Sequence, residues 1–476
     1  MSNVRNQHNY HLGMKNPYSH AETFIAQLKS VEQQINQNQL PEAAQQLNRL
    51  VKTAPHDPRL FLLGSRLAEA AGNHEGMLQA ARKAHQLAPQ WPAAIMHLAG
   101  VLGSRDEADE ALTLAAQAVQ QATTDGALDS ELLKTAATLA QRLAQHTSAL
   151  VWLRQAEQMN PADSGTRYKI GLSLSASGDF AGAIEVFTSL LAQLPDNPSI
   201  LSARLQAGLR GQQLALAVQD AEALLALDPT NEEIRFYLAV ARGETPPTQP
   251  ASMISGLFNA SADRFDRQMV GQLQYNLPRI VGQKIHEWHP DRKGDVLDLG
   301  CGTGLLGVCL GPIEGVLVGV DLSSEMIGQA ARHNVYDSFH QVNVLDALQA
   351  TPAGLYHVIT ALDVFNYVGD LGPVLPNAYR ILLPGGRLVF SCEAGAQGGA
   401  DYALLHTYRY THQRSYVQRL LAEAGFKDIE MEDRVLRFEA EQPVPGFLVT
   451  ARKQPQAPEK TGLRKRALKN PQPASS

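Results

Sequence analysis

Hydrophobic positions recur at helical spacing over the N-terminal half of the chain, from about Glu22 to Gly243. This stretch is rich in Ala, Leu and Gln, and apolar residues three or four positions apart fall on one face of a helix. Beyond Met253 the pattern changes to short aliphatic and β-branched runs that alternate with helical stretches. The pattern therefore predicts an all-helical part followed by an α/β part.

Prolines mark the helical part at regular intervals. They stand at Pro55, Pro89, Pro161, Pro195 and Pro229. Three of the intervals are 34 residues long, and the fourth is 72, which is two such units plus four. Thirty-four residues is the period of the tetratricopeptide repeat, a pair of antiparallel helices. We therefore expect six units, followed by one last helix from Asn231 to Arg242.

The clearest unit resembles the tetratricopeptide signature in three places. The motifs L-G-x-x-Y and A-x-x-x-F and the closing proline are matched, in order, by Ile170-Gly171-x-x-Leu174, Ala183-x-x-x-Phe187 and Pro195. Small residues there let paired helices approach closely. The resemblance implies a right-handed solenoid over residues 22–243 whose concave face binds peptides or protein partners. A purely structural or dimerising platform is the alternative.

Residues 244–252, ETPPTQPAS, separate the two parts. Their three prolines cannot continue a helix and favour a semi-rigid, extended spacer, so we place the domain boundary here. The α/β domain is expected at residues 253–453, between a flexible N-terminus at 1–21 and a disordered tail at 454–476. From Arg452 onward the chain has seven basic residues and one acid, which makes this tail locally basic.

Five short apolar runs in the α/β part are typical of strands. They are Val296–Leu299, Val316–Val320, Val342–Leu345, His357–Leu362 and Arg387–Ser391. Helical stretches between several of them indicate right-handed crossovers and a parallel sheet covered on both faces. Two later runs, Ile429–Phe438 and Gly446–Ala451, have no helix between them and should pair antiparallel at one edge. The predicted fold class is an all-α solenoid joined to a Rossmann-like, seven-stranded α/β domain.

The stretch from Gly294 to Gly307, GDVLDLGCGTGLLG, carries the strongest functional signal. Its strand contains Asp298 and runs into Gly300, Gly302 and Gly304. Glycine permits positive φ and close approach of main-chain N–H groups to a ligand, and the next helix offers its partly positive N-terminus. G-x-G-x-x-G is also the dinucleotide fingerprint. An acid at position 298, however, suits a cationic ligand better than a pyrophosphate.

Two further acids follow strands of the predicted sheet. Asp321 ends the run VLVGVD, where a carboxylate is placed to bind two ribose hydroxyls. Asp346 follows VNVL, where an adenine edge could be bound. Together with Asp298, these carboxylates outline one adenosine-like ligand.

With these residues in place, the domain resembles class I S-adenosylmethionine-dependent methyltransferases over roughly Met253 to Lys453. The resemblance implies that Gly300–Gly304 hold the methionine portion, Asp321 the ribose and Asp346 the adenine amino group. The run ILLPGGRLVF also resembles the family's turn into its fifth strand. The implied cofactor-binding residues are Asp298, Gly300, Cys301, Gly302, Gly304, Asp321, Leu322, Met326, Asp346, Ala347 and Asp363.

A narrower resemblance is to methyltransferases that carry tetratricopeptide repeats at the N-terminus. In these a segment like LFDxYAxxFD precedes the cofactor domain, and here it reads LFNASADRFD over residues 257–266. Asn259 replaces the usual Asp and Ser261 the usual Tyr, which puts that tyrosine's contact in doubt. The segments DVFNYVGDL at 363–371 and RYTHQRSY at 409–416 also resemble this subgroup and bound the expected acceptor pocket.

Methyl transfer is an in-line displacement, which requires alignment and exclusion of water more than it requires acids or bases. If the acceptor is a hydroxyl or a protonated amine, His412 or Tyr410 is the candidate to take or orient its proton. The alternative is that His412 caps a helix or faces solvent. Asp363 and Tyr367 are expected to shape the pocket floor, with or without a chemical role.

Charge and cysteine content narrow the function classes. The chain has 41 Lys+Arg and 47 Asp+Glu, a net charge of −6 that offers no general attraction to nucleic acid or an anionic membrane. The three cysteines lack paired metal-ligand spacing and cannot all form disulfides, so no metal is expected. The polar N-terminus and the absence of a long apolar run predict a cytoplasmic protein.

The acceptor stays open between a small molecule and a protein, an acidic carrier protein included. The chain has no NPPY or DPPY after the fourth strand and no Pro-Cys nucleophile, which makes methylation of nucleic-acid bases unlikely. Two rival functions are a non-catalytic scaffold that binds S-adenosylmethionine and a dinucleotide-dependent oxidoreductase. The repeat domain is expected to bind a protein partner.

Overall fold

The computed structural model describes residues 22–105, 107–262, 265–266, 269, 271, 273–439 and 441–455. The expected flexible N-terminus and almost all of the expected basic tail lie outside these residues. The chain divides into two compact units, Met1–Leu227 and Asp228–Ser476. None of the helices in the described part of the chain combines the length and apolar character needed to cross a membrane.

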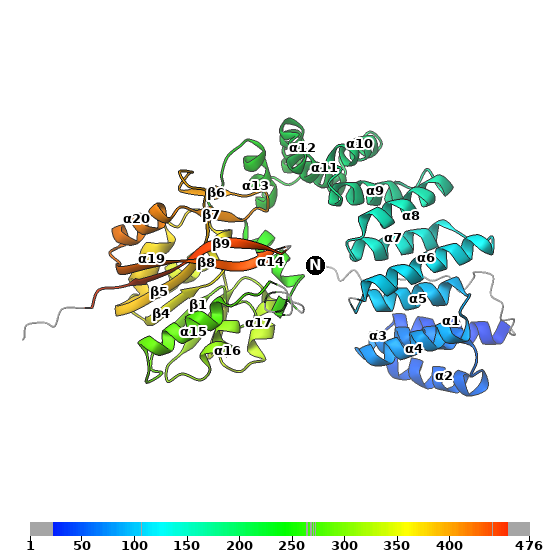
Figure 1. Ribbon diagram of the computed structural model, residues 1–476. Coiled ribbons are helices and arrows are strands. Elements are labelled where there is room, and N and C mark those ends of the chain that lie inside the picture. The colour runs from blue at the N-terminus through cyan, green and yellow to red at the C-terminus, as the bar shows by residue number, and fades with distance from the viewer. Residues whose placement is uncertain are drawn as a thin grey trace, which may run out of the picture. The chain divides into compact units, whose positions relative to one another are not determined.

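Helices alone make up the described part of the first unit, and consecutive helices pack as six pairs (Figure 1). This confirms the six expected repeat units. The pairs are α1 (Glu22–Asn36) with α2 (Leu40–Thr53), α3 (Pro58–Ala70) with α4 (His74–Leu87), α5 (Pro92–Gly103) with α6 (Ala108–Thr124), α7 (Ser130–Arg142) with α8 (His146–Met159), α9 (Ser164–Ala176) with α10 (Phe180–Leu191) and α11 (Pro198–Arg210) with α12 (Leu214–Leu227).

The marker prolines lie in the turns that follow the second helix of a pair, after α2, α4, α8, α10 and α12. A proline just beyond the helix cannot continue it, so each one ends its repeat. The pair α5–α6 has no such proline, and α6 instead ends at Asp125-Gly126, where Gly126 has a φ of 64°. The 72-residue interval therefore contains one repeat that ends on glycine.

Packing inside the fifth pair explains the small residues of the repeat signature. Ala183 and Phe187 of α10 are completely buried. A Cβ added to Gly171 of α9 would lie 2.4 Å from Phe187 Cε1. The absence of a side chain at Gly171 therefore leaves the space that the Phe187 ring occupies.

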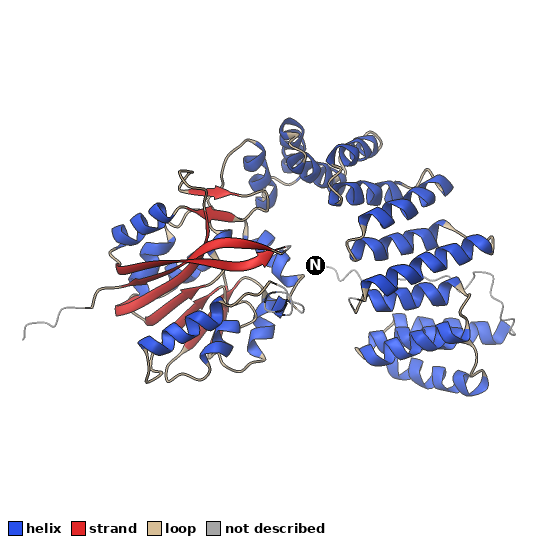
Figure 2. Cartoon of the chain, in the orientation of Figure 1, coloured by secondary structure: helices blue, strands red, loops and turns tan. Residues whose placement is uncertain are grey.

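The second unit begins with helices and continues as an α/β sandwich (Figure 2). Its helices are α13 (Glu232–Ala241), α14 (Ala251–Asn259), α15 (Leu277–Trp288), α16 (Leu305–Leu310), α17 (Ser324–Ala331), α18 (Val344–Ala350), η2 (Phe365–Tyr367), α19 (Val374–Ile381) and α20 (Arg414–Ala424). Helix α13 is the last helix that we assigned to the repeats. Its contacts instead place it in the unit that contains the sheet.

One mixed sheet of nine described strands forms the centre of the second unit. The strands are β1 (Val296–Leu299), β2 (Leu317–Asp321), β3 (Ser338–Gln341), β4 (Tyr356–Ala361), β5 (Leu382–Ala394), β6 (Tyr402–Leu404), β7 (Tyr410–His412), β8 (Lys427–Glu439) and β9 (Gln442–Arg452). Their order is β3-β2-β1-β4-β5, with β5 continuing to β9 and β8 and also to β7 and β6. β1 to β5 are parallel, and β8 and β9 pair antiparallel as expected.

Two of the strand predictions need correction. The third strand is Ser338–Gln341 rather than Val342–Leu345, because Asn343 caps α18 and the apolar residues after it belong to that helix. The count of seven strands omitted the hairpin β6–β7. Its strand β7 pairs with Glu393 and Ala394 of β5, beyond Phe390, where the register with β4 ends.

Alternating residues of the central strands enter different cores. Leu297 and Leu299 of β1 pack with residues of α19 and α20, whereas Val296 packs with α15 and α16. Burial on both faces is expected of a parallel sheet between helices. The arrangement fixes the carboxyl ends of β1, β2 and β4 at one edge of the sheet, where the candidate site lies.

The segment between α13 and α14 is not a free spacer. Pro247 O accepts hydrogen bonds from the backbone N–H groups of Gly369 and Asp370, both 2.9 Å long. Thr248 forms an antiparallel bridge with Val368. We call residues 246–250 the strap, because they bind along the loop after η2. The expected extended linker is thus part of the second unit.

Gly171→Ala is expected to destabilise the first unit by about 1–3 kcal/mol, because the new methyl group forces the Phe187 ring to move. Gly208→Ala in α11 is the matched control, since a Cβ there meets no atom closer than 3.5 Å. The control should be neutral or stabilising by about 0.5–1 kcal/mol through helix propensity. Urea denaturation followed by circular dichroism measures both, and equal shifts would contradict the packing role of Gly171.

Candidate functional site

The loop between β1 and α16 takes backbone conformations that favour glycine. Gly300, Gly302 and Gly304 have φ values of 65°, 52° and 86°. A Cβ on Gly300 would lie 2.4 Å from Val364 Cγ2, so a side chain there would collide with the segment after β4. At Gly302 the nearest atom to such a Cβ is 4.0 Å away, on Phe265. The loop backbone is therefore open toward the space beneath Phe265.

Asp321, the last residue of β2, joins this loop to the next one. Its Oδ2 accepts a hydrogen bond of 2.8 Å from Gly302 N–H, and its Oδ1 accepts one of 2.9 Å from Ser323 N–H. Burial raises the pKa of this carboxyl, and the backbone N–H groups oppose that rise. Each carboxylate oxygen has a second lone pair, so the group retains acceptor capacity for a ligand.

Asp298 of β1 is buried close to Asp321. Tyr336 Oη donates to its Oδ2 at 2.7 Å, and Thr360 Oγ1 donates to its Oδ1 at 2.8 Å. Burial raises the pKa of Asp298 to about 6, although both hydroxyl donors act to lower it. Within the described residues neither Asp298 nor Asp321 forms an ion pair. The two carboxylates are thus available to a ligand that brings hydroxyl groups and positive charge.

A cavity of about 900 Å³ opens over these tips of the sheet. Most of the cofactor-binding residues implied by the sequence line it, namely Asp298, Gly300, Cys301, Gly302, Asp321, Leu322, Met326 and Asp363. Three are not among its lining residues, namely Gly304, Asp346 and Ala347. The structure therefore brings most, but not all, of the predicted set to one site.

Asp346 is the clearest departure from the sequence-based prediction. It lies in the first turn of α18 rather than at a strand end, and it is exposed. Its backbone N–H donates to Asn343 Oδ1 at 2.9 Å, as in a helix N-cap. Asn343, Val344 and Leu345 line the cavity in its place. Sequence reasoning favoured the carboxylate, and the capping pattern N-x-x-D was the signal that could have identified Asn343.

The segment with the unusual Asn and Ser covers the same edge. Asn259 Oδ1, at the end of α14, accepts a hydrogen bond of 2.6 Å from Ser323 Oγ, the N-cap residue of α17. Ser261 Oγ donates instead to Leu257 O and Phe258 O of its own helix end. Asn259 thus attaches this segment beside Asp321, while Ser261 makes no such attachment.

Aromatic rings continue this cover over the cavity. Phe258 has edge contacts with Phe265 and Tyr367, with ring centroids 6.1 and 5.5 Å apart. Thr303 Oγ1 also hydrogen-bonds to Asp266 Oδ1, which ties the cover to the glycine loop. Packed aromatic rings of this kind limit the access of water, a condition that favours displacement at a charged centre.

Tyr410 and His412, the candidates for proton transfer, are buried inside the second unit and do not line the cavity. Tyr410 Oη donates to Pro246 O of the strap at 2.8 Å. His412 Nε2 lies 3.0 Å from both Val368 O and Gly369 O, and burial lowers its pKa to about 4. Their places in the hairpin β6–β7 give them structural roles, and the expected proton transfer has no support.

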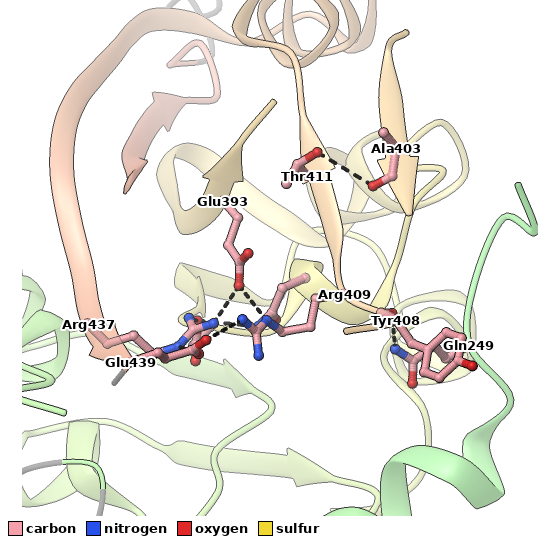
Figure 3. A network of polar contacts seen from close by, with 10 residues as sticks. Gln249, Glu393, Ala403, Tyr408, Arg409, Thr411, Arg437 and Glu439 are labelled. Carbon is pink, nitrogen blue, oxygen red and sulfur yellow. Dashed lines mark hydrogen bonds and ion pairs between the residues drawn. The ribbon is translucent and has the colours of Figure 1, made fainter. Parts of the chain in front are cut away.

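A network of charged side chains, absent from the sequence-based prediction, lies beside the cavity (Figure 3), and its members Asp363, Arg409, Arg437 and Glu439 line it. Arg437 of β8, whose side chain is 3% exposed, donates to Asp363, Glu393 and Glu439. Arg409 donates to Glu393 at 2.8 Å and to Glu439 at 2.7 Å. Acids and bases on separate strands gave no recognisable motif, so only the folded sheet assembles them.

Asp363 belongs both to this network and to the glycine-loop region. It follows β4 with a φ of 58°, and its N–H donates to Ser391 Oγ at 2.8 Å. Burial raises the pKa of its carboxyl, while Arg437, 2.6 Å away, acts to lower it. The next residue, Val364, is the one that faces Gly300. Strained residues of this kind are common at binding sites.

A parallel sheet with a glycine loop after β1, acids at the ends of β1 and β2, and a large cavity over both defines a cofactor-binding α/β domain of the methyltransferase class. The family model described as "Methyltransferase domain" matches residues 265–431. The second unit therefore contains a methyltransferase domain, as the resemblance seen in the sequence predicted.

Curated relatives of this domain include ubiquinone biosynthesis O-methyltransferases. The one from Psychrobacter arcticus is 29% identical over 149 residues, which are 28% of this chain and 58% of that protein. The one from Burkholderia cenocepacia is 26% identical over 189 residues, 35% of this chain and 82% of that protein. The match thus spans little more than half of the first relative.

A solved structure similar to the repeats is YrrB, a TPR protein with an unusual peptide-binding site. It is 17% identical, with a TM-score of 0.35, and the match covers 41% of this chain and 97% of that protein.

Asp298→Asn tests the burial of this carboxyl through the pH dependence of stability. Because folding raises the pKa from its usual 3.8 to about 6, the stabilisation of the protonated form is complete below pH 3.8 and is lost as the pH rises through about 6. Relative to the non-titrating variant, the wild type should lose up to about 3 kcal/mol over this window.

Denaturation of both proteins between about pH 4 and pH 7 measures this difference. Thr360→Val removes a hydrogen bond that lowers the pKa, so in this variant the window should extend to higher pH. Stability curves of wild type and Asp298→Asn that run parallel through the whole range would contradict the raised pKa.

Proposed function

We propose that the second unit transfers a methyl group from S-adenosylmethionine to an acceptor held in the cavity over the sheet. The main support is the position of Asp321, which is fixed by the N–H groups of Gly302 and Ser323 and lines the cavity. A carboxylate held in this way is pre-organised to accept hydrogen bonds from vicinal hydroxyls, such as those of a ribose. The matched domain family supports the same activity.

In this proposal, different residues contact different parts of the cofactor. Asp321 would bind the ribose, and the backbone of Gly300–Gly302 would face the methionine portion. Asp298 would offer negative charge to the cationic part of the cofactor. Asn343 and its neighbours, rather than Asp346, would contact the adenine. The bound cofactor would supply a methyl group on a positively charged sulphur.

Residues of the chain then have to align the acceptor and dispose of its proton. Phe258, Phe265 and Tyr367 cover the site and exclude water. Asp363 lines the cavity with a carboxyl of raised pKa, and it replaces Tyr410 and His412 as the group available to receive a proton. O-methyltransferases among the relatives favour a hydroxyl oxygen as the methylated atom.

The alternative of a binding scaffold has one specific observation in its favour. Ser261, where the related sequences have Tyr, turns its hydroxyl to its own helix end, so that position contributes no group to the cavity. A dinucleotide-dependent oxidoreductase is disfavoured, since Asp298 lies beside the glycine loop, where a pyrophosphate would need neutral or positive groups.

For the first unit we propose recruitment of a protein partner. Its six stacked helix pairs form a repeat array of the kind whose surfaces bind peptides. Both units would remain in the cytoplasm, in keeping with the sequence-based expectation. The catalytic unit would then act where the partner of the repeats is found.

Asp321→Ala is expected to weaken S-adenosylmethionine binding by about 1.5 to 3 kcal/mol, the loss typical of hydrogen bonds to a charged group. Asp346→Ala is the matched control, because its exposed carboxylate lies off the cavity. Isothermal titration calorimetry measures both, with NAD as a second ligand. A preference for NAD, or equal losses in the two variants, would refute the assignment.

Removal of the first unit tests recruitment. A fragment that begins at Asp228 keeps α13 and the strap, and it should bind S-adenosylmethionine as tightly as the full chain. Affinity purification from a lysate with each protein, followed by mass spectrometry, should recover a partner only with the full chain. Recovery of the same partner by both proteins would place the binding surface on the second unit instead.

A further inference from the structure

The cavity is near the upper end of the size range of ligand sites. Pockets of about 300 to 1,000 Å³ accommodate drug-sized ligands, and this one has a volume of about 900 Å³. One part of its wall comes from the tips of β1 and β2. Another part comes from α13, the strap and α14, and we call this part the strap side. Its apolar residues include Phe236, Ala239, Pro246, Pro247 and Ile254.

The residues of the strap side are held in place by contacts with other parts of the second unit. Phe236 is buried and contacts the Tyr408 ring, with centroids 6.0 Å apart. Gln249, also buried, donates through its side chain to Tyr408 O (Figure 3). Pro246 O is held by Tyr410 Oη. The apolar face that α13 and the strap present to the cavity is thus fixed by contacts behind it.

Two of the arginines in the cavity wall, Arg437 and Arg409, are already paired, because they donate to three carboxylates, Asp363, Glu393 and Glu439. The third, Arg235, is exposed. Breaking a buried charge pair leaves an uncompensated charge and costs several kcal/mol. Three carboxylates against two arginines leave the network with no surplus positive charge for an anionic ligand, so it favours ligands that leave it intact.

The charge balance of the described lining residues points the same way. Three arginines, Arg235, Arg409 and Arg437, line the cavity. The carboxylates number six, namely Glu232, Asp298, Asp321, Asp363, Asp370 and Glu439. Six negative and three positive groups leave an excess of negative charge, and a cofactor with net positive charge offsets only part of it. A cavity of this sign attracts cations and repels anions.

We infer that the acceptor is a small molecule with an apolar body and no negative charge, seated against the strap side of the cavity. This inference rests on the proposed function, and it excludes the acidic carrier protein and anionic metabolites as acceptors. The apolar wall accounts for the body of the acceptor, and the paired arginines account for the absence of an anionic group.

Two dyes that share the anilinonaphthalene ring system and differ in charge test the inference without any turnover. N-phenyl-1-naphthylamine is neutral, and 1-anilinonaphthalene-8-sulfonate is its anionic counterpart. Fluorescence titration of the full chain should show the neutral dye binding about tenfold tighter or more, because the negative cavity repels the sulfonate. Ala239→Phe, which fills the strap side, should abolish this binding.

Val240→Phe is the matched control, because its position is next on α13 but not among the cavity-lining residues. It should leave the neutral dye's affinity unchanged. Both variants should bind S-adenosylmethionine like the wild type in calorimetry, which confirms that they fold. Equal or tighter binding of the sulfonate at a site that Ala239→Phe blocks, or failure of the neutral dye to bind, would overturn the inference.

Transfer of label separates this inference from the proposed function. Methyl-labelled S-adenosylmethionine is incubated with the protein and a small-molecule extract, the mixture is freed of unreacted S-adenosylmethionine by reversed-phase chromatography, and the remaining labelled compounds are passed over an anion-exchange resin. Label in the unretained, neutral or cationic fraction is the expected result. Label in the retained fraction would overturn the acceptor class alone, whereas no label in any fraction would overturn methyl transfer itself.

Discussion

The candidate site depends on the carboxylate of Asp321, which accepts hydrogen bonds from two loops at once. Gly302 belongs to the loop after β1, and Ser323 begins α17 after β2. The two loops follow the neighbouring parallel strands β1 and β2, so this contact sets the distance between the loops at the carboxyl edge of the sheet. Ser323 also holds Asn259 of the cover. The glycine loop at the floor of the cavity and the segment that covers it are therefore both positioned by the contacts of Asp321 and its neighbour Ser323.

A second organising element is the charged network around Arg437. It joins the segment after β4, the end of β5 and the end of β8, which are far apart in the sequence. Buried ion pairs contribute little net stability, because desolvation offsets their attraction. Their consequence here is geometric, since they fix Asp363 at the cavity and leave the two arginines with no surplus positive charge. The same network therefore shapes the site and restricts what it accepts.

Folding of the strap into the second unit changes how the two parts of the chain are connected. Composition suggested a spacer that only joins repeats to catalysis, because prolines lack N–H groups and resist helix formation. Prolines retain their carbonyl oxygens, however, and Pro246 and Pro247 use them to accept hydrogen bonds. Helix α13, which the 34-residue period assigns to the repeats, contributes Phe236 and Ala239 to the cavity instead.

The sequence predicted those features of the architecture that depend on interactions between residues close together in the chain. Repeats, strands and the glycine loop depend on local preferences such as helical periodicity, proline in turns and glycine at positive φ, and these were visible in the residues. Asp346 was predicted to follow a strand, because the short apolar run Val342–Leu345 fits the end of a strand as well as the start of a capped helix. Tyr410 and His412 carried suitable chemistry, but their burial away from the cavity depends on the hairpin β6–β7.

The sequence by itself determined that a helical repeat array precedes a methyltransferase domain, and that Asp298 and Asp321 flank its glycine loop. These features depend on period, composition and residues close together in the chain. Only the tertiary structure decided which groups line the cavity, how Arg409 and Arg437 are neutralised, and that α13 and the strap form its apolar wall. Such contacts join residues up to 164 positions apart, and their formation depends on the packing of the whole unit.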